Sequence, residues 1–239
     1  MLSANPTTTE AITAAFDNLP QKDPSLSLTK YYKGITLRED IRVVDIQPDC
    51  ATIRASRREI FPCLEGEIHL HSQIFPKSFS GRIRPIDYSQ GTFLLSDLAY
   101  AEWKDRSFER VHPKDCIYVN LHHNRGTCRA FLKDISVDGM GILGYKAIDL
   151  FNQFGVGLKV TLDFRLSEGE PLAILVGKLV YRQKTRSELV KFGLILSPND
   201  HQKHTLQQYI SRRKDDILEE IYQVYIRSWE PYRVENLYF

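Results

Sequence analysis

Two groups of residues have side chains and a spacing suited to binding an anionic, ring-containing molecule. Arg106 and Arg110 stand four positions apart in "RSFER". Guanidinium groups bind phosphates through paired hydrogen bonds and stack on flat rings. Further along, Asp134, Ser136 and Gly139 occupy "DISVDG". Asp134 and Ser136 leave an extended chain on the same face, so they can contact one partner together.

Gly139 has two possible roles in this stretch. A glycine provides a positive φ, or it allows an approach too close for a Cβ atom. The stretch is therefore either a plain turn or a polar notch beside a turn. In the first case Asp134 and Ser136 serve only as turn formers, and the arginines are solvated.

The composition limits what such a site can bind. Thirty-two Lys and Arg against thirty Asp and Glu give a formal charge of only +2. A protein that holds a nucleic-acid polymer through its phosphates carries a much larger positive field, so we expect no nucleic-acid polymer as partner. Any anion site must be local.

The sequence also indicates the cellular compartment of the protein. The four cysteines, Cys50, Cys63, Cys116 and Cys128, form no C-x-x-C pair. No apolar run approaches the roughly 18 residues that span a bilayer, and the N-terminus does not resemble a secretion signal. We expect a cytoplasmic protein with no membrane insertion.

The positioning elements are predicted to be mainly β-strands. Short β-branched or aromatic segments alternate with Pro, Gly, Asp and Asn from Tyr31 to Leu196. They fall into two sets, which predict two small β-barrels in tandem. We expect a tail with a short helix over 1–30, the first barrel over 31–100, a linker arm with both arginines over 101–112, and the second barrel over 113–198.

The chain closes with a helical pattern. Apolar residues recur at three- and four-residue intervals after Asn199 or Asp200, and predict a long C-terminal helix over 199–230. Its apolar stripe packs along its own domain, or else meets another barrel or a second copy of the chain. Residues 235–239, "ENLYF", look like a protease site used to remove affinity tags.

The two residue groups together resemble the signatures of the PilZ domain family. These signatures are R-x-x-x-R followed by D/N-x-S-x-x-G, and here Arg110 and Asp134 are 24 positions apart (134 minus 110). All five positions match: Arg106, Arg110, Asp134, Ser136 and Gly139. The resemblance covers roughly Asp105 to the end of the native chain and implies a six-stranded PilZ barrel followed by a helix. The N-terminal β-module is similar in character to that of the flagellar-brake group.

The resemblance implies a non-catalytic receptor for cyclic di-GMP. The arginines would contact phosphates and guanine faces, and Asp134 and Ser136 a guanine edge, with Gly139 beneath the purine. In this family an Arg directly before R-x-x-x-R goes with two stacked ligand molecules. Here that position is Asp105, so one ligand per chain is expected. An effector protein, of the flagellar motor or exopolysaccharide machinery for example, would read a ligand-dependent change between the domains.

Other readings stay open. The PilZ barrel could be silent toward ligand and serve as a constitutive protein-interaction module. A barrel for single-stranded nucleic acid is the third class, but a basic groove and spaced aromatics are missing. No catalytic motif, cofactor site or metal-ligand spacing is apparent, including around His69 and His71.

The first barrel carries a weaker echo of the signature. Arg54 and Arg58 precede "PIDYSQG", in which Asp87, Ser89 and Gly91 are one residue too short for the second motif. This indicates a related barrel without the ligand residues, or a chance similarity between two turns. Arg54, Arg57 and Arg58 are then expected on a solvated or interface face.

Overall fold

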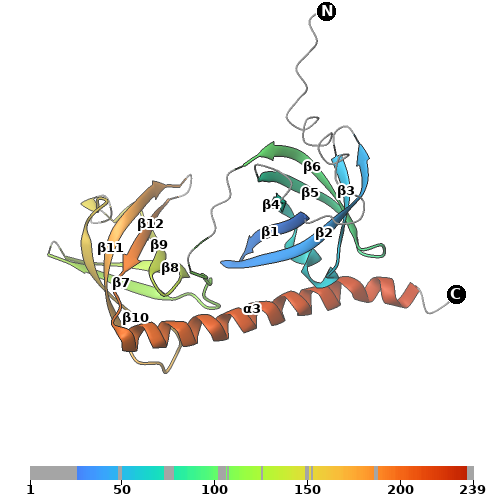
Figure 1. Cartoon of the computed structure of the whole chain (residues 1–239). Helices are drawn as coiled ribbons and strands as arrows, with labels where there is room; N and C mark the ends of the chain where they lie inside the picture. The colour runs from blue at the N-terminus through green and yellow to red at the C-terminus, as the bar shows by residue number, and fades with distance from the viewer. Residues whose placement is uncertain are drawn as a thin grey trace, which may run out of the picture. The chain divides into compact units, whose positions relative to one another are not determined.

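A computed structural model of the 239-residue chain shows a mainly β protein with two barrels and one long helix (Figure 1). It describes residues 26–47, 50–72, 78–101, 106, 108–124, 126–148, 151, 153–185 and 188–235. The chain divides into two compact units, with the main boundary between Asp105 and Arg106. The prediction of two tandem barrels is confirmed. The short helix expected near the N-terminus lies outside the described residues.

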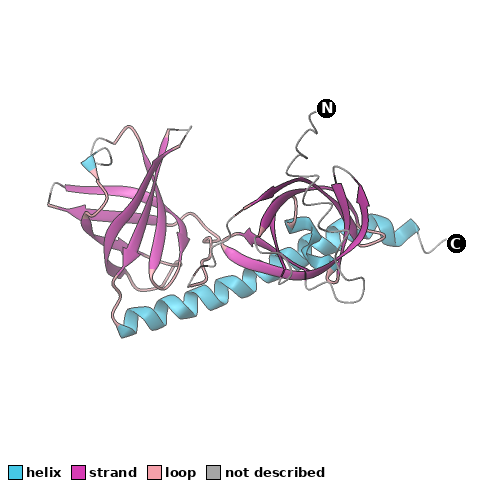
Figure 2. Ribbon diagram, turned by 45° about the horizontal axis from the view of Figure 1, so that its top comes forward, coloured by secondary structure: helices cyan, strands magenta, loops and turns pink. Residues whose placement is uncertain are grey.

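Six antiparallel strands close the first barrel in the order β1-β2-β3-β6-β5-β4, and they curve round to meet in Figure 2. A 3-10 helix, η1, follows β3. The bounds are β1 Leu26–Tyr32, β2 Ile35–Gln47, β3 Cys50–Ala55, η1 Arg58–Cys63, β4 Gly66–Ser72, β5 Phe79–Asp87 and β6 Thr92–Tyr100.

The first barrel begins earlier than the expected boundary at residue 31. Leu26 and Leu28 in β1 have side chains that are buried in the barrel core. The intervening Ser and Thr residues made this stretch look like a polar tail. Its pairing with β4, Leu28 opposite Leu70, shows that it closes the barrel.

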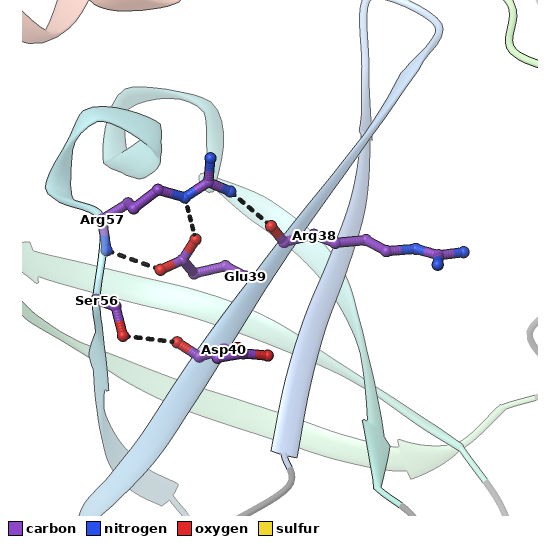
Figure 3. Close-up of polar contacts among 5 residues, drawn as sticks. All are labelled: Arg38, Glu39, Asp40, Ser56 and Arg57. Carbon is purple, nitrogen blue, oxygen red and sulfur yellow. Dashed lines mark hydrogen bonds and ion pairs between the residues drawn. The ribbon is translucent and has the colours of Figure 1, made fainter.

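One buried carboxylate in the first barrel is held by an arginine (Figure 3). The Glu39 side chain on β2 is 3% exposed. Arg57 donates to it twice, from the backbone N at 2.7 Å and from Nε at 2.5 Å. A further bond joins Arg57 Nη2 to the Arg38 carbonyl at 2.7 Å. Arg57 therefore ties the start of η1 to β2, which is more than the solvated role expected from the sequence.

The second barrel closes in the order β7-β8-β9-β12-β11-β10. Its core contains Leu121, Ile142, Leu162, Phe192 and their neighbours. The bounds are β7 Tyr118–His123, β8 Gly126–Ile135, β9 Gly139–Tyr145, β10 Lys159–Phe164, β11 Ala173–Lys184 and β12 Leu189–Leu196.

The two barrels have the same strand order. Counted from the first strand of each, both read first, second, third, sixth, fifth, fourth. Asp134 and Gly139 flank the turn between the second and third strands of their barrel, whereas Asp87 and Gly91 flank the turn between the fifth and sixth. The Asp87 motif of the first barrel therefore does not lie at the position equivalent to the Asp134 motif of the second barrel. Asp87 Oδ1 accepts from the Ser89 and Gln90 backbone amides at 2.9 and 3.1 Å, which is ordinary turn chemistry.

The long C-terminal helix, α3, spans Asp200–Glu235. A reciprocal cap starts it: Asn199 Oδ1 accepts from the Gln202 amide, and Gln202 Oε1 accepts from the Asn199 amide, both at 2.9 Å. Up to Ile217 the helix belongs to the second unit, and from Leu218 to the first. The observed helix extends five residues beyond the C-terminal end of the predicted helix, which was 199–230.

Candidate functional site

The linker arm reaches the signature turn through a short antiparallel bridge. The Val111 amide donates to the Ile135 carbonyl, and the Ile135 amide donates to the Val111 carbonyl, both at 3.0 Å. Val111 is fully buried, which supplies an apolar anchor at this point. The bridge places Arg110 beside Asp134, each one residue before a bridge partner. Two motifs distant in sequence are thereby joined by backbone pairing.

Arg110 and Asp134 form an ion pair. Arg110 Nη1 donates to Asp134 Oδ1 at 3.2 Å. The Asp134 side chain is 12% exposed and that of Arg110 is 37% exposed. A carboxylate this sheltered needs a charged partner to offset its lost hydration. Both groups keep further hydrogen-bonding capacity, because a carboxylate has about four acceptor positions and a guanidinium five donors.

Ser136 has a different position from the one expected of a ligand contact. It is completely buried. Its hydroxyl donates within the turn, to Asp138 Oδ1 at 2.8 Å or the Gly139 carbonyl at 3.1 Å, and its amide donates to the same carbonyl. In this arrangement Ser136 fixes the turn that carries Asp134.

Gly139 lies close to its neighbours on several sides. A Cβ atom there would lie 3.2 Å from the Leu194 carbonyl oxygen and 3.4 Å from both Arg110 Nη2 and Ser136 Oγ. Its φ is outside the positive range, so of the two roles open from the sequence, the close approach is the one observed. A larger residue would press on the arginine and on the turn at once.

Gly141 belongs to the site although the signature reasoning missed it. It pairs with Asp134 across the β8–β9 ladder. A Cβ atom at Gly141 would lie 2.8 Å from Asp134 Oδ2 and 2.9 Å from Oδ1. The Asp134 carboxylate therefore lies over bare backbone. Two residues beyond Gly139 in "GMG", this glycine is visible in the sequence, but its partner depends on strand register.

Arg106 is not part of the Arg110–Asp134 pair. It is exposed, and its Nη1 donates to the Gly34 carbonyl at 3.3 Å. Gly34 lies in the short segment Lys33–Ile35, which clusters with the second unit. Of the five predicted site residues, the structure thus brings together Arg110, Asp134, Ser136 and Gly139.

The first part of α3 holds the arm from another direction. Arg213 is only 4% exposed, and its Nε donates to the His112 carbonyl at 2.9 Å. Lys214 Nζ donates to Glu109 Oε1 at 2.7 Å. Burial lowers the pKa of His112, and nearby Asp134 opposes that shift. The contacts that Arg213 and Lys214 make with the arm belong to no sequence motif, so they could not be predicted from the sequence.

Neither a cluster of metal-ligating side chains nor a membrane-spanning helix occurs in the described part of the chain. Within those ranges no three His, Cys, Asp or Glu residues group in a way that could hold a metal ion. No described helix has the length and apolar character needed to cross a membrane. Burial raises the pKa of the Cys128 thiol to about 11.

Fold and site together define a two-barrel protein with an arginine–carboxylate site on the second barrel. Residues 104–212 match the PilZ domain family. This part of the chain is a PilZ domain, as the resemblance predicted. No curated protein gives a match.

Several solved structures match the chain at low sequence identity. The chain is 15% identical to YcgR in complex with c-di-GMP from Escherichia coli, with a TM-score of 0.46, covering 92% of this chain and 95% of that one. The chain is 17% identical to the K. pneumonia MrkH-c-di-GMP complex, with a TM-score of 0.42, covering 90% of this chain and 96% of that one. It is 16% identical to the Bacillus subtilis inhibitor of motility, MotI/DgrA, with a TM-score of 0.43, covering 82% of this chain and 99% of that one.

Proposed function

We propose that this protein is a non-catalytic receptor for cyclic di-GMP, a cytoplasmic adaptor that passes the signal to a protein partner. The PilZ match over residues 104–212 supports the ligand class. The observation that carries the proposal is the Arg110–Asp134 pair, in which Nη1 and Oδ1 lie 3.2 Å apart. It joins the two signature motifs at one place on the barrel.

The paired groups suit the two chemical parts of a cyclic dinucleotide. A guanidinium can bind a phosphate or the O6 and N7 acceptors of guanine in a bidentate manner. A carboxylate accepts from the N1 and N2 donors on the opposite edge of guanine, which adenine does not present in that form. Arg110 and Asp134 can therefore distinguish guanine from adenine.

The remaining signature residues have graded roles in this proposal. Ser136, whose hydroxyl is buried in the turn, positions Asp134, and Gly139 keeps the floor beside Arg110 open. Arg106, which is exposed, supplies the second cation for the phosphates. Both arginines lie in the connection between the barrels, so a ligand that binds them and Asp134 fixes that connection. A partner in the flagellar motor or exopolysaccharide machinery then responds to the altered arrangement.

The alternative is a PilZ barrel that binds no ligand and serves as a constitutive interaction module. The internal ion pair between Arg110 and Asp134 is the observation in its favour, because a silent pocket also pairs its charges internally. The two functions predict opposite results in one experiment.

Calorimetric titration of the purified chain tests the proposal. We expect saturable heat with cyclic di-GMP, and far weaker heat with cyclic di-AMP because of the guanine-edge contact. No heat at high micromolar cyclic di-GMP would rule out the receptor function and leave the silent module. Equal heats for the two dinucleotides would contradict guanine reading by Asp134.

A further inference from the structure

Two arginines lie directly opposite each other on the outer face of the first barrel. Arg42 on β2 pairs with Arg54 on β3 in the antiparallel ladder. Both side chains are exposed, while the neighbouring Ile41, Ile53 and Ala55 are buried in the core. Directly paired residues share a face, with Cβ atoms about 4.5 to 5.5 Å apart. The two arginines therefore leave the sheet side by side, toward solvent.

This pairing of like charges is unfavourable for the barrel alone. Like charges directly opposite each other destabilise a sheet. Within the described part of the chain, neither Arg42 nor Arg54 forms a salt bridge or a side-chain hydrogen bond. Two neighbouring cations without a counter-charge indicate a site for an anionic partner.

Two other outward arginines of the same barrel do have carboxylates nearby. Arg84 Nη2 lies 3.2 Å from Asp97 Oδ2. Arg82 on β5 pairs directly with Glu67 on β4. The positive charge of these two arginines is therefore met within the barrel, which sets the Arg42–Arg54 pair apart.

A third guanidinium lies close to the same pair of strands. Arg54 pairs with Thr92 on β6. A Cβ atom on Gly91, the residue before Thr92, would meet Arg58 Nε at 2.9 Å, so the Arg58 side chain lies against this glycine. Arg58 Nη1 also donates to the Ser89 carbonyl at 3.4 Å. Arg58 is thus held beside the strand position that pairs with Arg54, and the R-x-x-x-R of the first barrel contributes both ends to one cationic site.

Carboxylates limit the extent of this cationic site. Asp40 is exposed two residues before Arg42 on β2, so it shares the same face. Asp45, which follows a bulge in the same strand, is also exposed and pairs with Thr52 on β3. These carboxylates, and a formal charge of only +2, disfavour a broad polyanion such as a duplex or an anionic membrane. A narrow segment that brings a few carboxylates to the arginines avoids that repulsion.

The spacing of the arginine pair matches the spacing of acidic residues on a helix. Guanidinium and carboxylate groups form bidentate hydrogen-bonded pairs. Residues four apart on a helix have Cβ atoms about 5 to 6 Å apart, close to the distance between opposite residues of a ladder. Two glutamates four positions apart can therefore face Arg42 and Arg54 at the same time.

We propose that Arg42, Arg54 and Arg58 form a docking site for an acidic helical segment of a partner protein, with carboxylates four residues apart facing Arg42 and Arg54. This inference rests on the proposed function, because it names a surface for the protein partner of the adaptor. The site uses none of the residues assigned to cyclic di-GMP. Its contact with the acidic segment is electrostatic and requires no bound dinucleotide.

Fluorescence anisotropy with the full chain tests the docking site. The probe is a labelled alanine-based helical peptide of about 20 residues with pairs of glutamates four positions apart. We expect saturable binding at low ionic strength, and its loss in about 1 M salt. Arg42→Glu and Arg54→Glu should each weaken binding about tenfold or more, because each removes an attraction and adds a repulsion. The same peptide with glutamines in place of the glutamates should not bind.

Arg82→Glu is the matched control. Arg82 is exposed on the same barrel but lies opposite Glu67, so the affinity for the peptide should stay within about twofold. Arg42→Ala and Arg54→Ala should weaken peptide binding while the melting temperature stays equal or rises, because each removes a like-charge contact. A lower melting temperature with unchanged peptide binding would show that the two arginines are structural.

The remaining outcomes separate this inference from the proposed function. No peptide binding at low ionic strength, or equal losses for Arg82→Glu and Arg54→Glu, refutes the docking site. Tighter binding to phosphatidylserine vesicles or to duplex DNA than to the peptide also refutes it. If Arg54→Glu loses the peptide but keeps its calorimetric heat with cyclic di-GMP, the docking site and the receptor function both stand. If the unsubstituted chain binds the peptide but gives no heat with cyclic di-GMP, the receptor function alone fails.

Discussion

Arg110 donates to Asp134 at 3.2 Å although the two residues are 24 positions apart in the chain. The buried Val111–Ile135 bridge beside them fixes this proximity. A ligand that uses both groups meets a preformed site, so little of its binding free energy goes into ordering these two side chains. It must also compete with, or add to, the existing ion pair.

Removing either arginine of the arm should weaken binding of cyclic di-GMP. Charge-assisted hydrogen bonds contribute about 1.5 to 3 kcal/mol, so we expect Arg110→Ala or Arg106→Ala to lower affinity roughly tenfold to more than a hundredfold, measured by calorimetry. Arg58→Ala is the control, because Arg58 contacts the Ser89 carbonyl at 3.4 Å in the first barrel. Equal losses for Arg58 and Arg110 would show that the site was assigned to the wrong barrel.

Gly141→Ala should damage the site through one methyl group. The new Cβ would lie within 3 Å of the Asp134 carboxylate and displace it, so we expect about a tenfold or larger loss of cyclic di-GMP affinity. Gly155→Ala is the matched control, since a Cβ there meets nothing within 4 Å. Normal affinity in Gly141→Ala, with the fold checked by thermal melting, would mean that Asp134 is not a ligand contact.

Ligand binding should protect the arm from hydrogen exchange. The charged stretch from Trp103 to Val111 has few apolar anchors to offset the entropy cost of ordering. The Val111 amide already donates to the Ile135 carbonyl, so we expect the gain in protection to fall mainly before Arg110. Small-angle scattering should change as well. If ligand binds while both measurements stay flat, the signal must instead pass through contact between the bound ligand and a partner.

One molecule of cyclic di-GMP should bind per chain. Asp105 occupies the position where an arginine goes with a stacked ligand pair in the PilZ family, and its carboxylate repels further phosphates. Calorimetric stoichiometry near one is the expected result, and Asp105→Arg should raise it toward two. A value near two for the unsubstituted chain would overturn this prediction.

The buried Glu39 carboxylate makes Arg57 important for the stability of the first barrel. Arg57→Ala removes a charge-assisted bond to a side chain that is 3% exposed, so we expect the free energy of unfolding to fall by about 1.5 to 3 kcal/mol in urea titrations. The Arg84–Asp97 pair is a matched control, because both side chains are more than half exposed. Arg84→Ala should cost less than about 1 kcal/mol. Similar losses in both variants would argue against a special role for burial.

Local spacing along the sequence was enough to predict the strands and the C-terminal helix. Alternating apolar residues and turn formers indicated two sets of strands, and the change to a three- and four-residue period indicated the C-terminal helix. The five signature positions could be read directly because the family motifs are contiguous or closely spaced. Nothing in that reading depended on which strands are neighbours.

The tertiary structure decided how those elements meet. Leu26 and Leu28 became part of the first barrel only through their pairing with β4, and the buried position of Ser136 depends on how the turn closes. The pairing of Asp134 with Gly141 joins β8 to β9, and strand register together with a bulge places the two residues side by side. Register is a non-local property: shifting a strand by one residue moves all its side chains to the other face while leaving the local sequence pattern unchanged.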